Sequence, residues 1–123
     1  MSTRASTITY DNNHKQLYNH YCHYDGYPDG HGKELAQLLL SCESFSGIEQ
    51  THVYLDGMEL IGCEIENNHI THPDIEYLYQ VTLGDTITLT ITSVDWNDSW
   101  KQILDKKPIF KGTPKEFIQS LLH

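Results

Sequence analysis

The sequence predicts an α+β fold, in which an antiparallel sheet of four to five strands, built from two hairpins, carries two amphipathic helices on one face. Three observations support this prediction. Segments 6–24 and 75–94 alternate apolar and polar residues with the period of two that is typical of strands. Segment 35–42 places its apolar side chains at helical spacing. Near the C-terminus, residues 113–116 carry a helix-capping pattern.

The first hairpin is predicted from strands at 6–10 and 16–24, joined by residues 11–14, whose side chains tolerate the positive φ angles of a turn. Both faces of the second strand carry aromatic side chains, so we expect both to be at least partly covered. Segment 25–32 holds three glycines and a proline in eight residues. It predicts a sharp change of direction without regular structure.

The first helix is expected to begin at Lys33 and to direct the apolar residues of segment 35–42 toward the core. Asp29 or His31 is the predicted cap near its start, and Gly47 lies beyond its end. The helix therefore follows directly from the glycine-rich segment.

The middle of the chain carries weaker signals. Segments 53–55 and 58–61 flank Asp56-Gly57, a pair that suits a type I′ turn, and so predict a tight hairpin. Alternatively, segment 58–65 is a short helical or irregular piece. Residues 67–73 predict a loop.

The second hairpin has the clearest pattern of the whole chain. Strands at 75–83 and 86–94 alternate almost without interruption and are joined by Gly84-Asp85. Asp98-Ser99 is expected to cap a short helix that carries Trp100, Ile103 and Leu104.

The final helix is predicted from Thr113 as N-cap, Pro114 at the first position and Glu116 at the third, which together form a capping box. Its expected buried face consists of Phe117, Ile118, Leu121 and Leu122.

A chain of 123 residues is expected to form a single domain, residues 1–123. Its N-terminus is polar and lacks the apolar stretch of a secretory signal. The longest apolar run, residues 38–40, is far shorter than the roughly 18 residues that span a bilayer. We therefore expect a cytoplasmic protein without membrane contact.

The three cysteines, Cys22, Cys42 and Cys63, are odd in number and too far apart for a metal-binding knuckle. Each lies in an apolar or strand-like context, where a free cysteine is usually a small core residue. The sequence offers no support for a nucleophilic role, and we expect neither a catalytic residue nor a cofactor.

The net charge of the chain argues against nucleic acid as a direct partner. Seventeen acidic residues oppose eight basic ones, which gives a net charge of −9 and a pI near 5.1. Such a surface repels phosphate backbones, so we expect no direct nucleic-acid binding. It suits docking on a basic protein surface, although excess acid also serves solubility alone.

Two segments supply the predicted partner-binding residues. The first is the aromatic and acidic loop, and the second is a stretch of acids that can imitate a row of phosphates. The alternative for this second group is a solvated edge that protects the sheet from aggregation. The residues are Tyr24, Asp25, Tyr27, Asp29 and His31 in the loop, and Asp56, Glu59, Glu64, Glu66 and Asp74 in the acidic stretch.

The same loop supports an alternative hypothesis, a small metal-dependent enzyme. Imidazole and carboxylate groups are the ligands and acid–base groups of hydrolytic metal sites. The candidate ligands are His23, Asp25, Asp29 and His31. Their spacing matches no established metal motif, and a turn needs Asp and Gly for its geometry alone.

Four segments carry a family resemblance. Residues 2–5 (STRA), 17–18 (LY), 23–32 (HYDGYPDGHG) and 74–79 (DIEYLY) resemble a group of small phage and prophage proteins. The resemblance covers about the first 42 residues and the strand after Asp74, and it implies a mobile-element context.

Small acidic proteins from that context often inhibit host defence, as anti-CRISPR proteins do. The leading hypothesis is therefore a non-catalytic protein that docks on a basic surface of a host protein or ribonucleoprotein complex. A third alternative is a homodimeric scaffold that pairs through an exposed edge strand.

Overall fold

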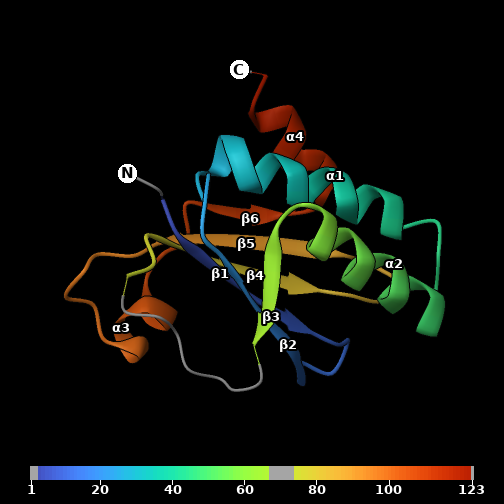
Figure 1. Ribbon diagram of the computed structural model, residues 1–123, viewed down its shortest axis with the longest axis horizontal. Coiled ribbons are helices and arrows are strands. Elements are labelled where there is room, and N and C mark those ends of the chain that lie inside the picture. Colours follow the sequence, from blue (N-terminus) through green and yellow to red (C-terminus); the bar gives the residue numbers. More distant parts are fainter. Residues whose placement is uncertain (1–2, 67–73, 123) are drawn as a thin grey trace.

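The computed structural model describes residues 3–66 and 74–122. Within these residues the chain forms six strands in one mixed sheet, four α-helices and one π-helical turn (Figure 1). In chain order the elements are β1 (Ala5–Tyr10), β2 (Gln16–Cys22), η1 (Pro28–Gly32), α1 (Lys33–Cys42), α2 (Gly47–Leu60), β3 (Cys63–Glu66), β4 (Tyr77–Thr82), β5 (Thr88–Ser93), α3 (Trp100–Asp105), β6 (Phe110–Gly112) and α4 (Pro114–Ser120).

The sheet has the strand order β3-β2-β1-β4-β5-β6. The two predicted hairpins, β1 with β2 and β4 with β5, are both present and antiparallel. The prediction of a wholly antiparallel sheet of four to five strands needs correction, because β1 pairs with β4 in parallel and the sheet has six strands. A local alternation pattern defines each hairpin but not how two hairpins join. The edge strands β3 and β6 are too short to show a period.

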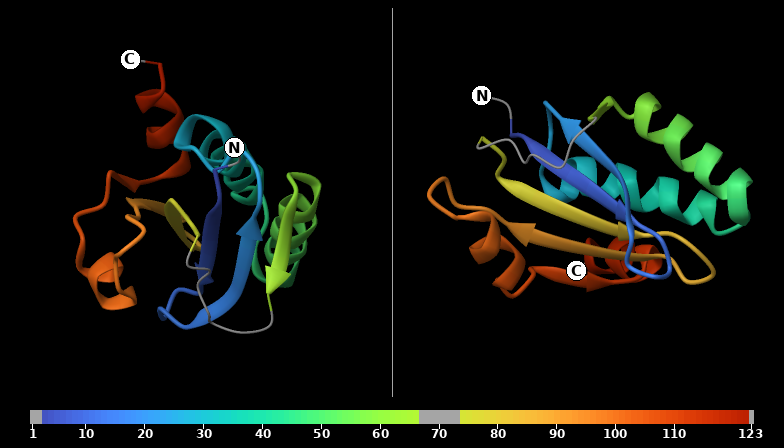
Figure 2. Two further views of the ribbon diagram at one scale, coloured as in Figure 1. Left: turned by 60° about the vertical axis from the view of Figure 1, so that its left-hand side comes forward. Right: turned by 90° about the horizontal axis from the view of Figure 1, so that it is seen from below.

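Helices cover the sheet unequally. On one face α1 packs between α2 and α4 over the main core (Figure 1). On the opposite face Ile103 of α3 packs on Ile8 and Leu78, which lie in β1 and β4. Figure 2 shows α3 on the side of the sheet opposite α1 and α2. The prediction of two helices on one face is therefore incomplete: three helices cover that face and a fourth covers part of the other.

Helix α1 confirms the predicted stripe, because Leu35, Leu39 and Cys42 are fully buried. The predicted caps are wrong, since no side chain caps its N-terminus. The chain enters α1 through η1, which also corrects the expectation that segment 25–32 holds no regular structure. Pro28 provides a backbone angle suited to a first helical turn, so the turn continues directly into the helix.

Helix α2 replaces the hairpin that was predicted around Asp56-Gly57. Its buried residues Gln50, Tyr54 and Met58 repeat every four positions and so form one helical face. Gly57 lies where this helix meets α1, and a Cβ at this position would clash with a methyl group of Leu38. The glycine thus permits close helix packing, and this burial outweighs the local turn propensity of Asp-Gly.

Both C-terminal helices begin as predicted. Ser99 and Thr113 each form a capping box, with Gln102 and Glu116 as the respective third residues. In α4 Phe117 is buried, whereas Leu122 is 78% exposed and does not belong to the predicted buried face. None of the described helices is long and apolar enough to cross a membrane. The predicted loop at 67–73 lies outside the described residues.

Candidate functional site

The aromatic and acidic loop is held by hydrogen bonds to the sheet. The Tyr79 hydroxyl donates to the Gly26 carbonyl over 2.6 Å, and the Gly26 amide donates to the Thr3 carbonyl. The His31 amide donates to the Asp25 carbonyl over 2.7 Å. Much of segment 25–28 (DGYP) therefore serves to fix the backbone of this turn.

The structure separates the four residues of the alternative metal-enzyme hypothesis. His31 is 1% exposed and points into the core, whereas His23 lies on the surface with its Nε2 3.4 Å from a carboxylate oxygen of Glu64. Asp25 is exposed and adopts a positive φ of 55°, as a turn residue does, and Asp29 is exposed in η1. These four side chains do not converge on one point.

Two aromatic residues of the loop remain accessible. Tyr24 is 71% exposed and Tyr27 is 46% exposed. Exposed tyrosines are enriched at protein interfaces, because a rigid ring offers a large contact area together with a polar group. Both can contact a partner in this structure.

The predicted acidic residues gather mainly at the β3 edge of the sheet. Asp56 and Glu59 of α2 and Glu64 of β3 line one hollow with a volume of about 480 Å³, together with the apolar side chain of Ile65. Glu66 follows in the same short strand. The tertiary structure thus brings the α2 acids to the acids of the edge strand.

The fifth residue of the acidic stretch, Asp74, has partners within this chain. Its carboxylate accepts a hydrogen bond from the Tyr21 hydroxyl at 2.9 Å and pairs with Arg4 at 3.3 Å. Burial, together with the hydrogen bond to Asp74, raises the pKa of Tyr21 to about 12. Asp74 therefore serves a local network and offers less charge to a partner than Asp56 or Glu59 does.

His20 also lines the acidic hollow but contributes no positive charge there. Burial, with a smaller effect from His31, lowers its pKa to about 4. The imidazole is therefore neutral at neutral pH, and the hollow keeps its negative potential.

Charge is distributed very unevenly along the chain. The segment 25–76 contains eleven acidic residues and one lysine, so it accounts for the net negative charge. Five of the seven lysines lie between residues 101 and 115, in and around α3, β6 and α4. Since β3 and β6 are opposite edges of the sheet, Glu64 and Glu66 lie at one edge and Lys111 lies at the other.

Apolar side chains lie beside the acids at the β3 edge. Leu60 at the end of α2 is 87% exposed, and Ile65 of β3 is 56% exposed. We use the term acidic edge for Asp56, Glu59, Leu60 and the strand β3 (Cys63–Glu66). Apolar residues within a charged rim are the typical arrangement of a protein interface.

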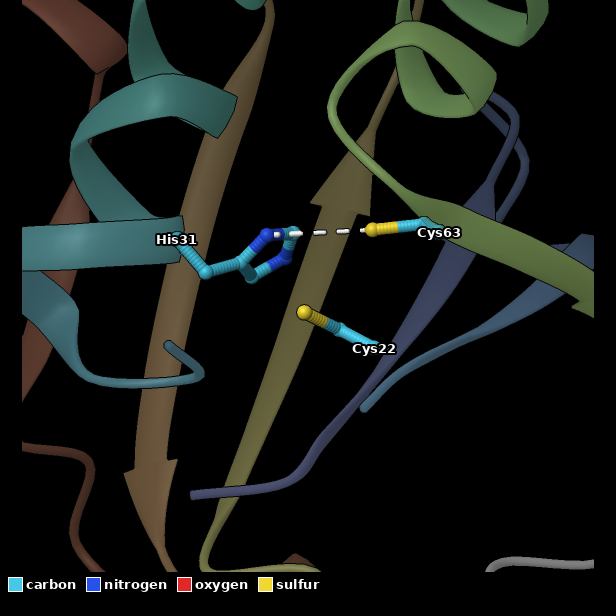
Figure 3. Close-up of side chains that lie close together, drawn as sticks. All are labelled: Cys22, His31 and Cys63. Atoms are coloured by element: carbon cyan, nitrogen blue, oxygen red, sulfur yellow. Dashed lines mark hydrogen bonds between the residues drawn. The ribbon is translucent and has the colours of Figure 1, made fainter. Parts of the chain in front are cut away.

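A second cluster lies beneath this edge on the helix-covered face. Cys22 and Cys63 are directly paired residues of β2 and β3, and His31 reaches them from η1. Figure 3 shows the three side chains pointing toward one another from these elements. Their candidate ligand atoms all lie within 4.8 Å of one another, and all three residues are buried. Among the described residues, no other group of three His, Cys, Asp or Glu side chains meets this criterion.

The imidazole of His31 is oriented from both sides. Its Nδ1 lies 3.7 Å from the Cys63 sulfur, and its Nε2 lies 3.3 Å from the hydroxyl of buried Thr7. The ring also packs edge-on against Tyr79 at a centroid distance of 4.8 Å. The Thr7 hydroxyl can accept the Nε2 proton, which leaves the Nδ1 lone pair directed at the thiols.

The two thiols differ in acidity. The neighbouring Cys63 thiol and the His31 imidazole hold the pKa of Cys22 well below its usual range, against the opposing effect of burial. The pKa of Cys63 is raised by Cys22 and by burial. The Cys22 thiol can also donate to the Tyr24 carbonyl oxygen, 2.9 Å away. Cys22 is thus the thiol that loses its proton more readily.

A small cavity of about 110 Å³ adjoins the cluster. Cys22, His31, Glu34 and Gly62 are among the residues that line it. Two thiols and an imidazole beside a small cavity can hold a soft or borderline metal ion.

The cluster escapes sequence analysis because Cys22, His31 and Cys63 follow no local spacing. The prediction that the cysteines are buried and free is confirmed for all three. Only the pairing of β2 with β3 places Cys63 beside Cys22. A contact between residues so far apart in the chain leaves no pattern in a single sequence.

Fold and site together define an α+β protein with a mixed six-stranded sheet, an acidic edge and a buried thiol–imidazole cluster. Comparisons with protein-family models, with curated proteins and with solved structures find no significant match for this chain. The resemblance to phage and prophage proteins stays a prediction.

Proposed function

We propose that this protein is a non-catalytic binding protein that docks its acidic edge on a basic surface of a partner protein. The observation that carries the proposal is the gathering of acidic residues around β3 and the end of α2, where Asp56, Glu59 and Glu64 line one hollow and Glu66 follows in β3. A localised negative surface attracts a basic surface, steers its approach and sets the orientation of the complex.

Composition of the acidic edge supports the proposal. No cation among the described residues pairs with Asp56 or Glu59 within this chain. Both carboxylates can therefore form ion pairs with a partner without breaking an ion pair within this chain. Leu60 and Ile65 provide apolar contact area beside them, and burial of such side chains supplies most of the affinity at an interface.

The family resemblance narrows the class of partner. A phage or prophage protein meets host proteins, and host nuclease complexes carry basic channels that hold nucleic acid. A row of carboxylates beside apolar anchors can occupy such a channel in place of phosphates. We therefore propose a host defence nuclease or ribonucleoprotein complex as the partner, and an inhibitory, anti-CRISPR-like outcome.

The proposal is tested by isothermal titration of the protein against purified CRISPR nuclease complexes, with and without bound nucleic acid, at two salt concentrations. We expect binding that weakens as salt rises, because salt screens exposed charges. We also expect bound nucleic acid to compete. Binding that is absent from all complexes, or indifferent to salt, contradicts the proposal.

A matched pair of variants localises the contact. Asp56→Asn/Glu59→Gln removes two charges from the acidic edge, whereas Asp85→Asn/Asp105→Asn removes two exposed charges elsewhere. We expect the first variant to lose about tenfold or more in affinity, since one ion pair at an interface rim contributes on the order of 1 kcal/mol. The second variant should bind almost normally. Equal losses contradict docking through the acidic edge.

A further inference from the structure

We propose that Cys22, His31 and Cys63 bind a zinc ion, with a fourth ligand supplied from the adjoining cavity. The observations that carry this inference are the convergence of three buried donor atoms and the orientation of the imidazole (Figure 3). The inference does not depend on docking at the acidic edge, because the cluster lies inside the molecule and shares only the buried Cys63 with that edge.

The spacing of the donor atoms suits zinc. Zn–S and Zn–N bonds of about 2.3 Å and 2.0 Å place the ligand atoms of a tetrahedral site roughly 3.6 Å apart. The distance from His31 Nδ1 to Cys63 Sγ is 3.7 Å, and all three donors lie within 4.8 Å of one another. Small changes in side-chain torsion angles would bring the sulfur atoms and the nitrogen onto one ion.

The chemistry of the donors points in the same direction. Two thiolates with one imidazole are a ligand set that zinc uses in proteins, and softer sulfur donors discriminate against magnesium and calcium. Each thiol gives up its proton when the metal binds, so the buried charge of two thiolates is balanced by the divalent ion. In an otherwise apolar core this is a way to stabilise three polar side chains together.

Thr7 gives His31 the support typical of a metal ligand. A metal-bound imidazole usually donates its second N–H to an oxygen, which fixes the tautomer and the ring orientation. Thr7 Oγ1 lies 3.3 Å from His31 Nε2, and Thr7 is 1% exposed. Nδ1 is therefore the nitrogen available to the metal.

The cavity supplies the fourth position. Glu34, in the first turn of α1, lines the cavity of about 110 Å³ together with Cys22 and His31. That volume accommodates a water molecule, and Glu34 is the second candidate for the fourth ligand because it lines the same cavity.

Cys42 is a buried cysteine of this fold that lies outside the donor cluster, so it can be compared with Cys22 and Cys63. It is fully buried in α1, and burial raises the pKa of its thiol to about 11. Cys42 is absent from the group of converging donors. The contrast provides a matched control within the same chain.

The experiment is elemental analysis of the protein purified under reducing conditions, followed by titration with Co²⁺ and competition with Zn²⁺. We expect one zinc per chain and the intense sulfur-to-cobalt charge-transfer absorption of a thiolate site. The variants Cys22→Ser and Cys63→Ser should lose that absorption and bind zinc at least tenfold more weakly. Cys42→Ser should retain both properties.

Thr7→Val is the second variant, chosen because its shape is nearly unchanged and the fold should survive. We expect zinc affinity to fall about tenfold to a hundredfold, as with other supports of metal ligands. Glu34→Gln decides the fourth ligand: a changed cobalt spectrum assigns it to the carboxylate, and an unchanged spectrum assigns it to solvent.

Three results would overturn the inference. The first is a folded, reduced protein that stays free of metal in excess zinc. The second is an equal loss of binding in Cys42→Ser. The third is a disulfide between Cys22 and Cys63 in the protein purified without reductant, detected by mass spectrometry, with no zinc taken up after reduction.

Discussion

The two edges of the sheet use charge in different ways. At the β6 end, Lys106 lies 2.6 Å from Asp98 and 3.3 Å from Asp95, and Lys101 pairs with Asp105 at 2.8 Å. At the β3 end, Asp56 and Glu59 have no cation partner among the described residues. Charges at the first edge hold the chain's own loops and helices, whereas Asp56 and Glu59 at the second remain available to another molecule.

The difference shows why net charge alone is a poor guide to function. A value of −9 describes the whole chain, but the fold pairs Lys101 and Lys106 with acids of the same segment and brings Asp56, Glu59 and Glu64 together around one hollow. The acidic edge also carries exposed Leu60 and Ile65. An interface is thus predicted by the position of charge relative to apolar surface, not by its sum.

The largest expected effect concerns the two hydrophobic clusters on the opposite faces of the sheet. Met58→Ala beneath the acidic edge should lower the free energy of unfolding by about 2–5 kcal/mol, because a fully buried side chain of the main core is lost and a cavity remains. Ile103→Ala, in the small cluster on the opposite face, should cost an amount at the lower end of this range. Urea denaturation measures both. A larger loss in Ile103→Ala would show that the small cluster dominates stability.

A smaller effect concerns helix capping. The Thr113 hydroxyl accepts a hydrogen bond from the Glu116 amide, whereas Ser46, the N-cap of α2, makes no side-chain cap bond. Thr113→Ala should therefore destabilise the protein by about 1 kcal/mol. Ser46→Ala should leave the urea midpoint nearly unchanged. Equal effects of the two substitutions would show that the observed cap geometry does not determine the stability of these helices.

The smallest expected effect tests the charges themselves. The hydrogen bond from Lys106 holds the pKa of Asp98 below its usual value of 3.8. Asp98→Asn should slightly lower the urea midpoint at neutral pH, while Asp56→Asn should leave it unchanged or raise it.

The pH dependence of Asp98 has a defined sign. A carboxylate whose pKa is lower in the folded state stabilises the protein above its unfolded pKa, and the stabilisation disappears as pH falls through the folded pKa. The stabilities of wild type and Asp98→Asn should therefore converge as the pH falls below 3.8, the ordinary pKa of the carboxyl, and through its lower pKa in the folded state. Denaturation at a series of pH values checks this. A difference that grows in acid would contradict the role of the Lys106 pair.

Several features of this protein were accessible from the sequence alone. Alternation with period two defined both hairpins, the apolar stripe defined α1, and the residues Ser99 and Thr113 marked the start of α3 and α4. The burial of all three cysteines also followed from their neighbours. These features depend on residues within a few positions of one another, and such residues leave a local pattern.

Tertiary structure alone decided the rest. The Asp56-Gly57 pair has a local preference for a turn, but packing of Gly57 against Leu38 and burial of Tyr54 and Met58 make this segment helical. The parallel contact of β1 with β4 and the pairing of Cys22 with Cys63 join segments far apart in the chain. Such contacts form because they bury apolar surface and satisfy backbone hydrogen bonds, and neither requirement specifies a sequence spacing.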